Sequence, residues 1–371
     1  MKIVRLSATP VEVPRSSYFL PKTAHGESAA SRYVILEIET DTGLIGVGEV
    51  TCSPRWNGEE ALGTTAVVNR YVAPAVVDAD PLSWADVARR LDAVVRDRPF
   101  LRAAVEMACL DLAGHHLDVP AHSLLGGSYR TEINTKFVLP ARQVDTVRRM
   151  AEQLKARGPS TVKVKVGLDV EADVARVSAV REVFGPEVDI TVDANEGWRP
   201  GEAISACRRL EDLGVVAVEQ PLPREAWMAS AALRNQTSMA VMGDESIWTY
   251  QDVFEAARTG AFDTVSVYPG KCGGVRAAVR IAEAARALGL AVAYGSNLEL
   301  GVGAAAMAHA IAATRELSPI IPADLIGPLY FESTLVRDTS FVGWAGAKVP
   351  TGSGLGVELD RSALAEYRLV V

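Results

Sequence analysis

The chain shows two different rhythms of apolar and polar residues, and the change between them comes near residue 131. Beyond it, short apolar runs of strand length alternate with longer segments in which apolar residues recur at helical spacing. The predicted strands lie at 133–139, 161–166, 190–193, 216–219, 239–243, 263–268, 290–295 and 320–321. The predicted helices lie between them, at 144–157, 169–184, 201–213, 225–235, 249–259, 274–288 and 303–313. This order predicts an α/β fold in which helices join parallel strands.

The part of the chain before residue 131 is organised differently. Strand-like alternation comes first, and a mainly helical stretch follows over 59–117. The predicted strands of this part lie at 2–13, 33–40 and 44–50, with polar loops at 15–31 and 53–58. The glycine-rich tail at 352–359 is expected to return to this region. We therefore predict an α+β domain over 1–130, completed by about 345–371, and a second, α/β domain over 131–344.

Two lysines stand out in the predicted strand from Thr161 to Val166. Side chains on a strand alternate between its two faces, so Lys163 and Lys165 share one face and the valines share the other. An ordinary surface strand shows the same alternation, so these lysines alone do not indicate a site. The residues that end the next three strands change this interpretation.

A carboxylate ends each of the next three predicted strands, as Asp193, Glu219 and Asp244. The intervals are 26 and 25 residues, which suits one strand, one helix and two loops, the repeat of a (β/α)₈ barrel. Such residues meet at the carboxyl-terminal face of the barrel, where three negative charges repel one another unless a cation lies between them. A single Asp there would be explained as a helix cap. Three carboxylates at the ends of three successive strands predict a site for Mg²⁺, with Mn²⁺ as a substitute, because all the ligand atoms are oxygens.

Composition narrows the classes of function. The 371 residues are 49% hydrophobic and 23% charged, with a formal net charge of −8, which is typical of a globular protein and argues against a nucleic-acid-binding surface. No apolar run of about 18 residues predicts a membrane span, and the N-terminus has no signal-peptide pattern. The cysteines have no metal or redox spacing; they are Cys52, Cys109, Cys207 and Cys272. We therefore expect reduced thiols and a cytoplasmic protein.

Taken together, these features resemble the enolase superfamily, in particular the muconate-lactonizing (muconate cycloisomerase) subgroup of the mandelate racemase–muconate lactonizing enzyme family. The three carboxylates stand in Val192-Asp193-Ala194-Asn195, Val218-Glu219-Gln220-Pro221 and Gly243-Asp244-Glu245-Ser246, after the Lys-x-Lys strand. The resemblance covers essentially the whole chain. It implies a (β/α)₇β barrel with an N-terminal capping domain. It also implies an enzyme that removes the proton α to a substrate carboxylate, or protonates the equivalent enolate.

The resemblance assigns roles to single residues. Asp193, Glu219 and Asp244 would hold Mg²⁺. Lys165 would be the acid/base, and Lys163 would lower the pKa of Lys165 and help to stabilise the enolate. The family is usually oligomeric, so the partners expected are a small-molecule carboxylate and further copies of the chain, with neither nucleic acid nor membrane.

Substrate contacts follow from the same resemblance. The cap loops around His25 and Trp56 would contact the distal part of the substrate, and Gly295-Ser296-Asn297-Leu298-Glu299 resembles the motif of the seventh strand. There Glu299 would lie near the acid/base groups, although a cap on the next helix explains its spacing equally well. The residues expected to bind substrate are His25, Trp56, Asn195, Ser296 and Asn297.

The chain departs from the subgroup at the sixth strand. Members usually carry a second lysine five residues before a Gly-Gly pair. Here the pair is Gly273-Gly274, and the fifth residue before it is Tyr268. Lys271 lies two residues before the pair, where the family more often has arginine. In the first interpretation, Tyr268 replaces the missing lysine, or Lys271 does so through a shifted loop. In the second, the second face of the site has no strong base. We favour the second interpretation.

This departure bears on the reaction. A racemase or epimerase needs acid/base groups on both faces of the enolate, whereas a syn cycloisomerisation or syn elimination needs one, here Lys165. The segment Asp324-Leu325-Ile326-Gly327-Pro328 also resembles the Glu-Leu-x-Gly-Pro segment of muconate cycloisomerases. We therefore expect a Mg²⁺-dependent lactonizing enzyme of the muconate cycloisomerase type. The alternatives are a dehydratase or racemase/epimerase of another acid (an N-acyl or cyclic amino acid, or a hydroxy acid) and a non-catalytic binding protein.

Overall fold

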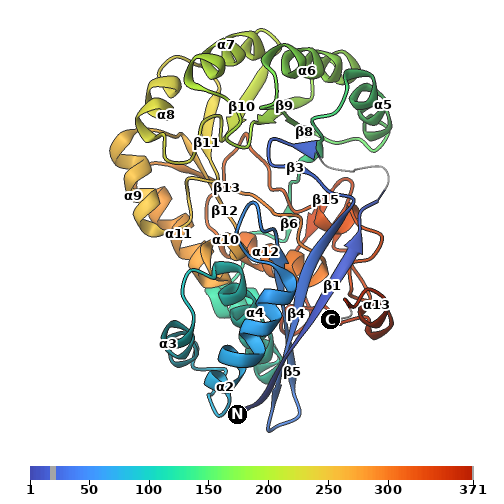
Figure 1. Ribbon diagram of the computed structural model, residues 1–371, viewed down its shortest axis with the longest axis vertical. Coiled ribbons are helices and arrows are strands. Elements are labelled where there is room, and N and C mark those ends of the chain that lie inside the picture. Colours follow the sequence, from blue (N-terminus) through green and yellow to red (C-terminus); the bar gives the residue numbers. More distant parts are fainter. Residues whose placement is uncertain (17–21, 370–371) are drawn as a thin grey trace.

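A curled sheet of parallel strands forms the centre of the computed structural model, which describes residues 1–16 and 22–369 (Figure 1). Its strand order is β13-β12-β11-β10-β9-β8-β7, so neighbours in the sheet are neighbours along the chain. The strands are β7 (Phe137–Leu139), β8 (Thr161–Lys165), β9 (Asp189–Asp193), β10 (Val215–Glu219), β11 (Ala240–Gly243), β12 (Thr264–Val267) and β13 (Ala291–Tyr294). This arrangement confirms the predicted α/β fold.

Helices follow the strands and cover the outside of the sheet, as Figure 1 shows for α5 to α9. They are α5 (Val144–Lys155), α6 (Val170–Phe184), α7 (Pro200–Glu211), α8 (Trp227–Arg234), α9 (Tyr250–Thr259), the short α10 (Pro269–Cys272), α11 (Val275–Ala287) and α12 (Gly301–Ala313). Each predicted helix of the repeat is present with small shifts at its ends. No described helix has the length and hydropathy that a membrane crossing requires.

The predicted eighth strand at 320–321 is wrong, because these residues form a bend. The surrounding segment still bonds to both edges of the sheet: Ser318 and Asp324 donate their N–H groups to β13, and Ala323 pairs with residues just before β7. Pro319 and Pro322 flank the two isoleucines and have no N–H to give to a ladder, which prevents a regular strand.

The predicted first strand at 133–139 is divided in two. Its start forms β6 (Glu132–Ile133), which pairs with β15 (Gly346–Lys348) in a small sheet completed by β14 (Val342–Gly343). Its end forms β7 of the central sheet. The chain therefore passes from one sheet to the other within the segment that the sequence pattern showed as one strand.

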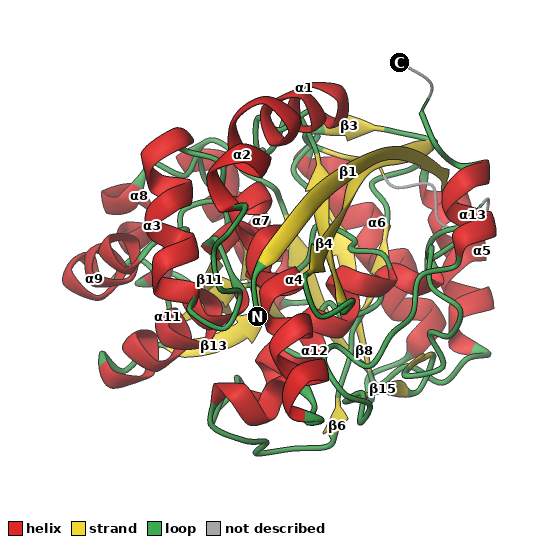
Figure 2. Ribbon diagram, turned by 90° about the horizontal axis from the view of Figure 1, so that it is seen from below, coloured by secondary structure: helices red, strands yellow, loops and turns green. Residues whose placement is uncertain are grey.

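The N-terminal region is an antiparallel sheet of order β1-β4-β5, formed by β1 (Ile3–Pro14), β4 (Ala30–Thr40) and β5 (Ile45–Cys52). Figure 2 shows β1 and β4 as long, curved strands running side by side. A small hairpin, β2 (Lys22–Thr23) and β3 (Gly26–Glu27), lies in the predicted loop 15–31, of which residues 17–21 lie outside the described residues. The helices are α1 (Ala61–Val67), α2 (Ala73–Val76), α3 (Trp84–Val94) and α4 (Pro99–Leu117), with a π-helical stretch at Val68–Val72.

Helix α4 lies directly against β5. A Cβ added to Gly48 would stand 1.9 Å from the backbone oxygen of Ala104, and one added to Gly46 would stand 2.2 Å from that of Ala108. Only glycine allows the helix and strand backbones to approach this closely. This contact fixes the helix on the face of the sheet.

Buried carboxylates join the N-terminal region to the rest of the molecule. Glu49 accepts hydrogen bonds from the N–H groups of Leu300 (2.7 Å) and Gly303 (3.0 Å) at the start of α12. Asp111 on α4 accepts one from the N–H group of Leu355 in the tail (2.8 Å). The boundaries of the predicted domains, at 130 and about 345, stay a prediction, and residues 370–371 lie outside the described chain.

Candidate active site

The three predicted metal ligands lie at the carboxyl-terminal ends of neighbouring strands. Asp193 ends β9, Glu219 ends β10, and Asp244 follows β11. Asp193 and Glu219 are paired in the register of the sheet, and Lys165 is paired with Asp193 from the other side. All of them, together with Lys163, line one cavity of about 510 Å³. The stride of the sequence pattern thus brings these residues into one site.

Each of these carboxylates is bonded to a lysine. Lys165 Nζ lies 2.5 Å from Asp193 Oδ2, and Lys163 Nζ lies 2.9 Å from Glu219 Oε2. Lys271, which the cavity lining does not include, donates to Asp244 Oδ1 at 2.6 Å. The buried carboxylates of the site are therefore paired one by one with ammonium groups, of which those of Lys163 and Lys271 are buried and that of Lys165 is partly buried.

Burial and charge set the protonation of the site. Burial raises the pKa of Glu219 to about 8, and the neighbouring Asp193 carboxylate adds to this shift. Burial alone would lower the pKa of Lys163, but the carboxylates Asp324, Glu219 and Asp193 around it raise that pKa well above its usual value. Lys163 is therefore a fixed cation, and it lies 3.5 Å from the same Asp193 oxygen that binds Lys165.

The donor set of the triad fits a hard divalent cation, because Asp193, Glu219 and Asp244 are buried and offer only carboxylate oxygens, and the charges of Asp193 and Asp244 both raise the pKa of Glu219. A second group lies beside it. Donor atoms of His25, Glu196 and Glu245 all lie within 4.8 Å of one another. Among the described residues, these three form the group of His, Cys, Asp or Glu side chains that is close enough together to hold a metal ion. It consists of His25 from the cap and two acids from the barrel.

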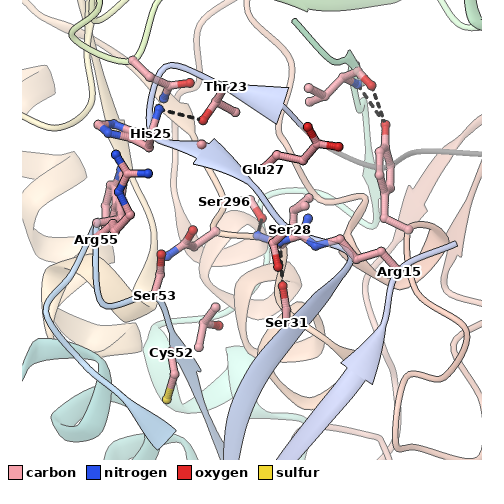
Figure 3. A pocket seen from close by; sticks show the side chains of 18 of the residues that line it. Arg15, Thr23, His25, Glu27, Ser28, Ser31, Cys52, Ser53, Arg55 and Ser296 are labelled. Atoms are coloured by element: carbon pink, nitrogen blue, oxygen red, sulfur yellow. Dashed lines mark hydrogen bonds between the residues drawn. The ribbon is translucent and has the colours of Figure 1, made fainter. Parts of the chain in front are cut away.

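Glu245, which sequence analysis did not single out, connects the predicted cap loops to the barrel. Its Oε1 lies 3.1 Å from His25 Nε2, 3.3 Å from Trp56 Nε1 and 3.0 Å from Asn195 Nδ2. The hydrogen bond to Glu245 raises the pKa of His25. His25, Trp56 and Asn195 all line the cavity, so three of the predicted substrate residues lie around this one carboxylate. Figure 3 shows His25 and Arg55 at one side of the cavity.

The seventh-strand residues fall into two groups. Ser296 and Asn297 line the cavity, whereas the buried Glu299 does not. Glu299 accepts hydrogen bonds from Ser296 Oγ (2.5 Å) and from the backbone N–H of Asn297 (3.1 Å). It therefore supports the turn that presents these two residues.

Tyr268 and Lys271, the candidates for the missing lysine, are both buried and engaged with neighbouring residues. The Tyr268 ring packs against Trp56 and Phe100, with ring centroids 6.0 and 6.3 Å apart, and burial raises the pKa of its phenol well above the usual value. Lys271 Nζ is held by three acceptors, two on Asp244 and the Ser266 carbonyl oxygen. Neither side chain belongs to the lining of the cavity.

The structure adds two further charged residues to the site, Asp324 and Lys136. Asp324 Oδ2 accepts from Lys163 Nζ (2.7 Å), and Asp324 Oδ1 lies 3.1 Å from the buried Lys136 Nζ. Asp324 stands in the Asp-Leu-x-Gly-Pro segment, which was a signal in the sequence. Lys136 had none, because it is 188 residues away along the chain and meets Asp324 only where the sheet curls.

Comparison with known proteins agrees with this geometry. Residues 7–126 match the family described as mandelate racemase / muconate lactonizing enzyme, N-terminal domain, and residues 145–363 match the one described as enolase C-terminal domain-like. The chain belongs to the enolase superfamily. Within this superfamily it falls in the muconate lactonizing enzyme subgroup, as the motifs predicted, and the predicted combination of a barrel and an N-terminal cap is confirmed.

Relatives of this enolase-superfamily chain include enzymes of two kinds. A chloromuconate cycloisomerase of Delftia acidovorans is 32% identical, over 99% of both chains. An N-succinyl-L-Arg/Lys racemase of Bacillus cereus is 29% identical, over 99% of this chain and 98% of the racemase. The crystal structure of 2-chloromuconate cycloisomerase from Rhodococcus opacus superposes with a TM-score of 0.95, at 29% identity and over the whole of both chains. The chain is therefore an enzyme, and its relatives include both cycloisomerases and racemases.

Proposed function

We propose that this enzyme is a Mg²⁺-dependent cycloisomerase of the muconate type, which works with a single acid/base. One observation carries the proposal. Lys165 lines the cavity next to the three carboxylates with 13% of its side chain exposed, whereas Tyr268 and Lys271, which follow the sixth strand β12, are buried outside the lining. A reaction that moves a proton on one face of the substrate suits this arrangement.

Asp193, Glu219 and Asp244 would hold the cation. When bound, Mg²⁺ would stabilise the negative charge that develops on the carboxylate oxygens of an enolate. The proton α to a carboxylate is too weakly acidic for an unaided lysine, so the site needs this charge stabilisation. Lys163 adds a permanent positive charge on the same side, since Glu219 and Asp324 hold it as an ammonium group.

Lys165 would move the proton. In lactonization, one carboxylate oxygen of the substrate bonds to a double-bond carbon, and the electron pair of that double bond shifts to the carbon α to the other carboxylate. Lys165 Nζ gives its proton to this carbon, and the reverse reaction takes it back. Asn195 Oδ1, 2.9 Å from Lys165 Nζ, would orient the ammonium group.

A racemase is the second candidate, because the Bacillus cereus relative is an N-succinyl amino acid racemase with comparable identity. That reaction needs a second acid/base opposite Lys165. Tyr268 would have to leave its packing against Trp56 and Phe100 to supply it. This requirement favours the cycloisomerase.

The first test is loss of cis,cis-muconate absorbance with and without Mg²⁺. We expect metal-dependent turnover in the wild type and a loss of at least a thousandfold in Lys165→Ala, because general acid/base groups contribute about 10²–10⁴-fold and the lysine also carries charge. Lys155→Ala, on the outer helix α5, is the matched control and should keep full activity. Tyr268→Phe should also remain active, since the phenol has no role in this mechanism.

Two results would contradict the proposal. Full activity in Lys165→Ala would exclude this lysine as the acid/base. Absence of muconate turnover would remove the substrate assignment, and exchange of the α-proton in D₂O across a panel of carboxylic acids would then show whether enolate chemistry occurs. Exchange with inversion would favour the racemase.

We further propose that the enzyme works in the cytoplasm and as a homo-oligomer. The cellular location is supported by four buried cysteines, all of them free thiols. The oligomer is supported by the apolar side chains exposed on the outer helices, such as Met228 and Phe254. Sedimentation of the purified protein tests the assembly.

A further inference from the structure

A second group of metal-ligand side chains lies where the hairpin β2–β3 meets the barrel. It consists of His25 in the turn of the hairpin, Glu196 after β9 and Glu245 after β11. His25 Nε2 lies 3.1 Å from Glu245 Oε1 and 3.8 Å from Glu196 Oε2. None of the three is a predicted Mg²⁺ ligand, and neither glutamate lines the cavity of the candidate active site.

The two glutamates lack the lysine partners that the triad has. In the described part of the chain, His25 is the basic side chain within ion-pair distance of Glu196 and of Glu245. One imidazole against two carboxylates leaves a net negative charge, although Glu245 has only 4% of its side chain exposed. A buried carboxylate without full compensation is costly, and a divalent cation would remove this cost.

One oxygen of Glu245 has no hydrogen-bond partner. Oε1 is shared by His25, Trp56 and Asn195, at 3.0 to 3.3 Å. Oε2 of the same carboxylate is buried, and no described residue donates to it. Since buried polar atoms are normally bonded, this oxygen indicates a missing ligand. A cation can use Oε2 while Trp56 and Asn195 keep their bonds to Oε1.

The other two side chains are also held in place. Glu196 Oε1 accepts a hydrogen bond from the backbone N–H of Arg224 at 2.8 Å, which leaves Oε2 on the side of His25. The backbone N–H of His25 donates to Thr23 Oγ1 at 3.1 Å, as the dashed line in Figure 3 shows. Supporting hydrogen bonds of this kind orient metal ligands before the ion binds.

The donor atoms favour zinc over magnesium. Zn²⁺ takes imidazole nitrogen and carboxylate oxygen at about 2.0–2.2 Å, so neighbouring ligand atoms of a tetrahedral site lie about 3.3–3.6 Å apart. The distances of 3.1 and 3.8 Å from His25 Nε2 lie on either side of that range. Mg²⁺ prefers oxygen ligands alone, as in the triad.

We propose that His25, Glu196 and Glu245 form a second metal site, for a divalent cation of the zinc type, that fastens the hairpin β2–β3 to the barrel. The cation takes the place of the hydrogen on Nε2, because only a neutral imidazole is a ligand. Water completes the coordination. This site is separate from the proposed reaction: its ligands come from both regions of the chain, and it does not require the triad.

The test is calorimetric titration of the metal-free, full-length protein with Zn²⁺. We expect the wild type to bind two ions per chain, one at the triad and one at the second site. His25→Ala and Asp193→Asn should each bind one, and the double variant none. Glu196→Gln should weaken the second site about tenfold or more, since even residues that only support a ligand change affinity about 10–100-fold.

His116→Ala is the matched control, because His116 is an exposed histidine away from the site, and it should bind two ions. The ion retained by His25→Ala shows that this variant is folded. A wild type with one ion that only Asp193→Asn loses would overturn the second site and leave the triad standing; one that only His25→Ala loses would do the reverse. Two ions in His25→Ala would also overturn the proposal.

Hydrogen exchange tests the fastening. Zn²⁺ should slow amide exchange over residues 22–27 in the wild type and in His116→Ala, but not in His25→Ala, because an ion that joins hairpin and barrel suppresses local opening. Equal exchange with and without Zn²⁺ in the wild type would refute this role.

Discussion

At the scale of single residues, the site is a set of matched charges. Three buried lysines and the partly buried Lys165 meet four buried carboxylates: Lys165 with Asp193, Lys163 with Glu219 and Asp324, Lys136 with Asp324, and Lys271 with Asp244. Breaking a buried pair by removing one partner leaves a charge without compensation, which costs several kcal/mol. A variant at one of these positions must therefore be tested for folding as well as for activity.

The triad predicts metal-dependent stability. For the wild type, Mg²⁺ at a hundred times its Kd should stabilise the fold by about 2.7 kcal/mol, which raises the thermal midpoint. Asp193→Asn should abolish that increase. Asp189→Asn, at the exposed opposite end of the same strand β9, should keep it. Thermal unfolding with MgCl₂ and with a chelator measures both, and an equal response of the two variants would count against the ligand assignment.

At the scale of elements, the approach of α4 to β5 depends on glycine. Gly48→Ala should destabilise the protein by about 3 kcal/mol, because the new methyl group would meet the backbone of Ala104 rather than a movable side chain. Gly201→Ala is the control, since a Cβ at that helical position meets nothing within 4 Å. Urea unfolding of both variants tests this. A Gly48→Ala protein as stable as the control would show that the helix can move away.

The elements also show what sequence can and cannot predict. The periodic pattern predicted the helices of the repeat and the stride of Asp193, Glu219 and Asp244, because these depend on local spacing. The prediction of an eighth strand was wrong, because Pro319 and Pro322 lack the N–H groups that a strand needs to pair within a sheet. Lys136 could not be recognised, because it stands 188 residues from Asp324 along the chain and meets it only in the folded structure.

At the scale of the whole molecule, Glu49 links the N-terminal sheet to the barrel and makes stability depend on pH. Burial raises the pKa of Glu49 to about 7, above its ordinary value of 4.5. The folded state therefore favours the protonated acid. The stabilisation that protonated Glu49 gives the folded state is complete below pH 4.5 and is lost as the pH rises through 7. A shift of this size corresponds to about 3 kcal/mol.

Glu49→Gln should reduce this pH dependence. The amide oxygen keeps an acceptor for the N–H groups of Leu300 and Gly303 but does not titrate. Between pH 5 and pH 8, the free energy of unfolding should fall by about 2.5 kcal/mol less in the variant than in the wild type. Chemical denaturation at several pH values gives the comparison. Parallel pH profiles for the two proteins would refute the assignment to Glu49.

The irregular segment 318–324 closes the barrel with hydrogen bonds at its two ends and prolines between them. We call this segment the seam of the barrel. Local opening of a fold costs the least free energy where backbone hydrogen bonds are few. Asp324, which holds Lys163 and Lys136, is the last residue of the seam. An opening of the barrel wall at this place would therefore separate Asp324 from both lysines together, so the closure of the barrel and part of the charge balance of its site depend on the same short segment.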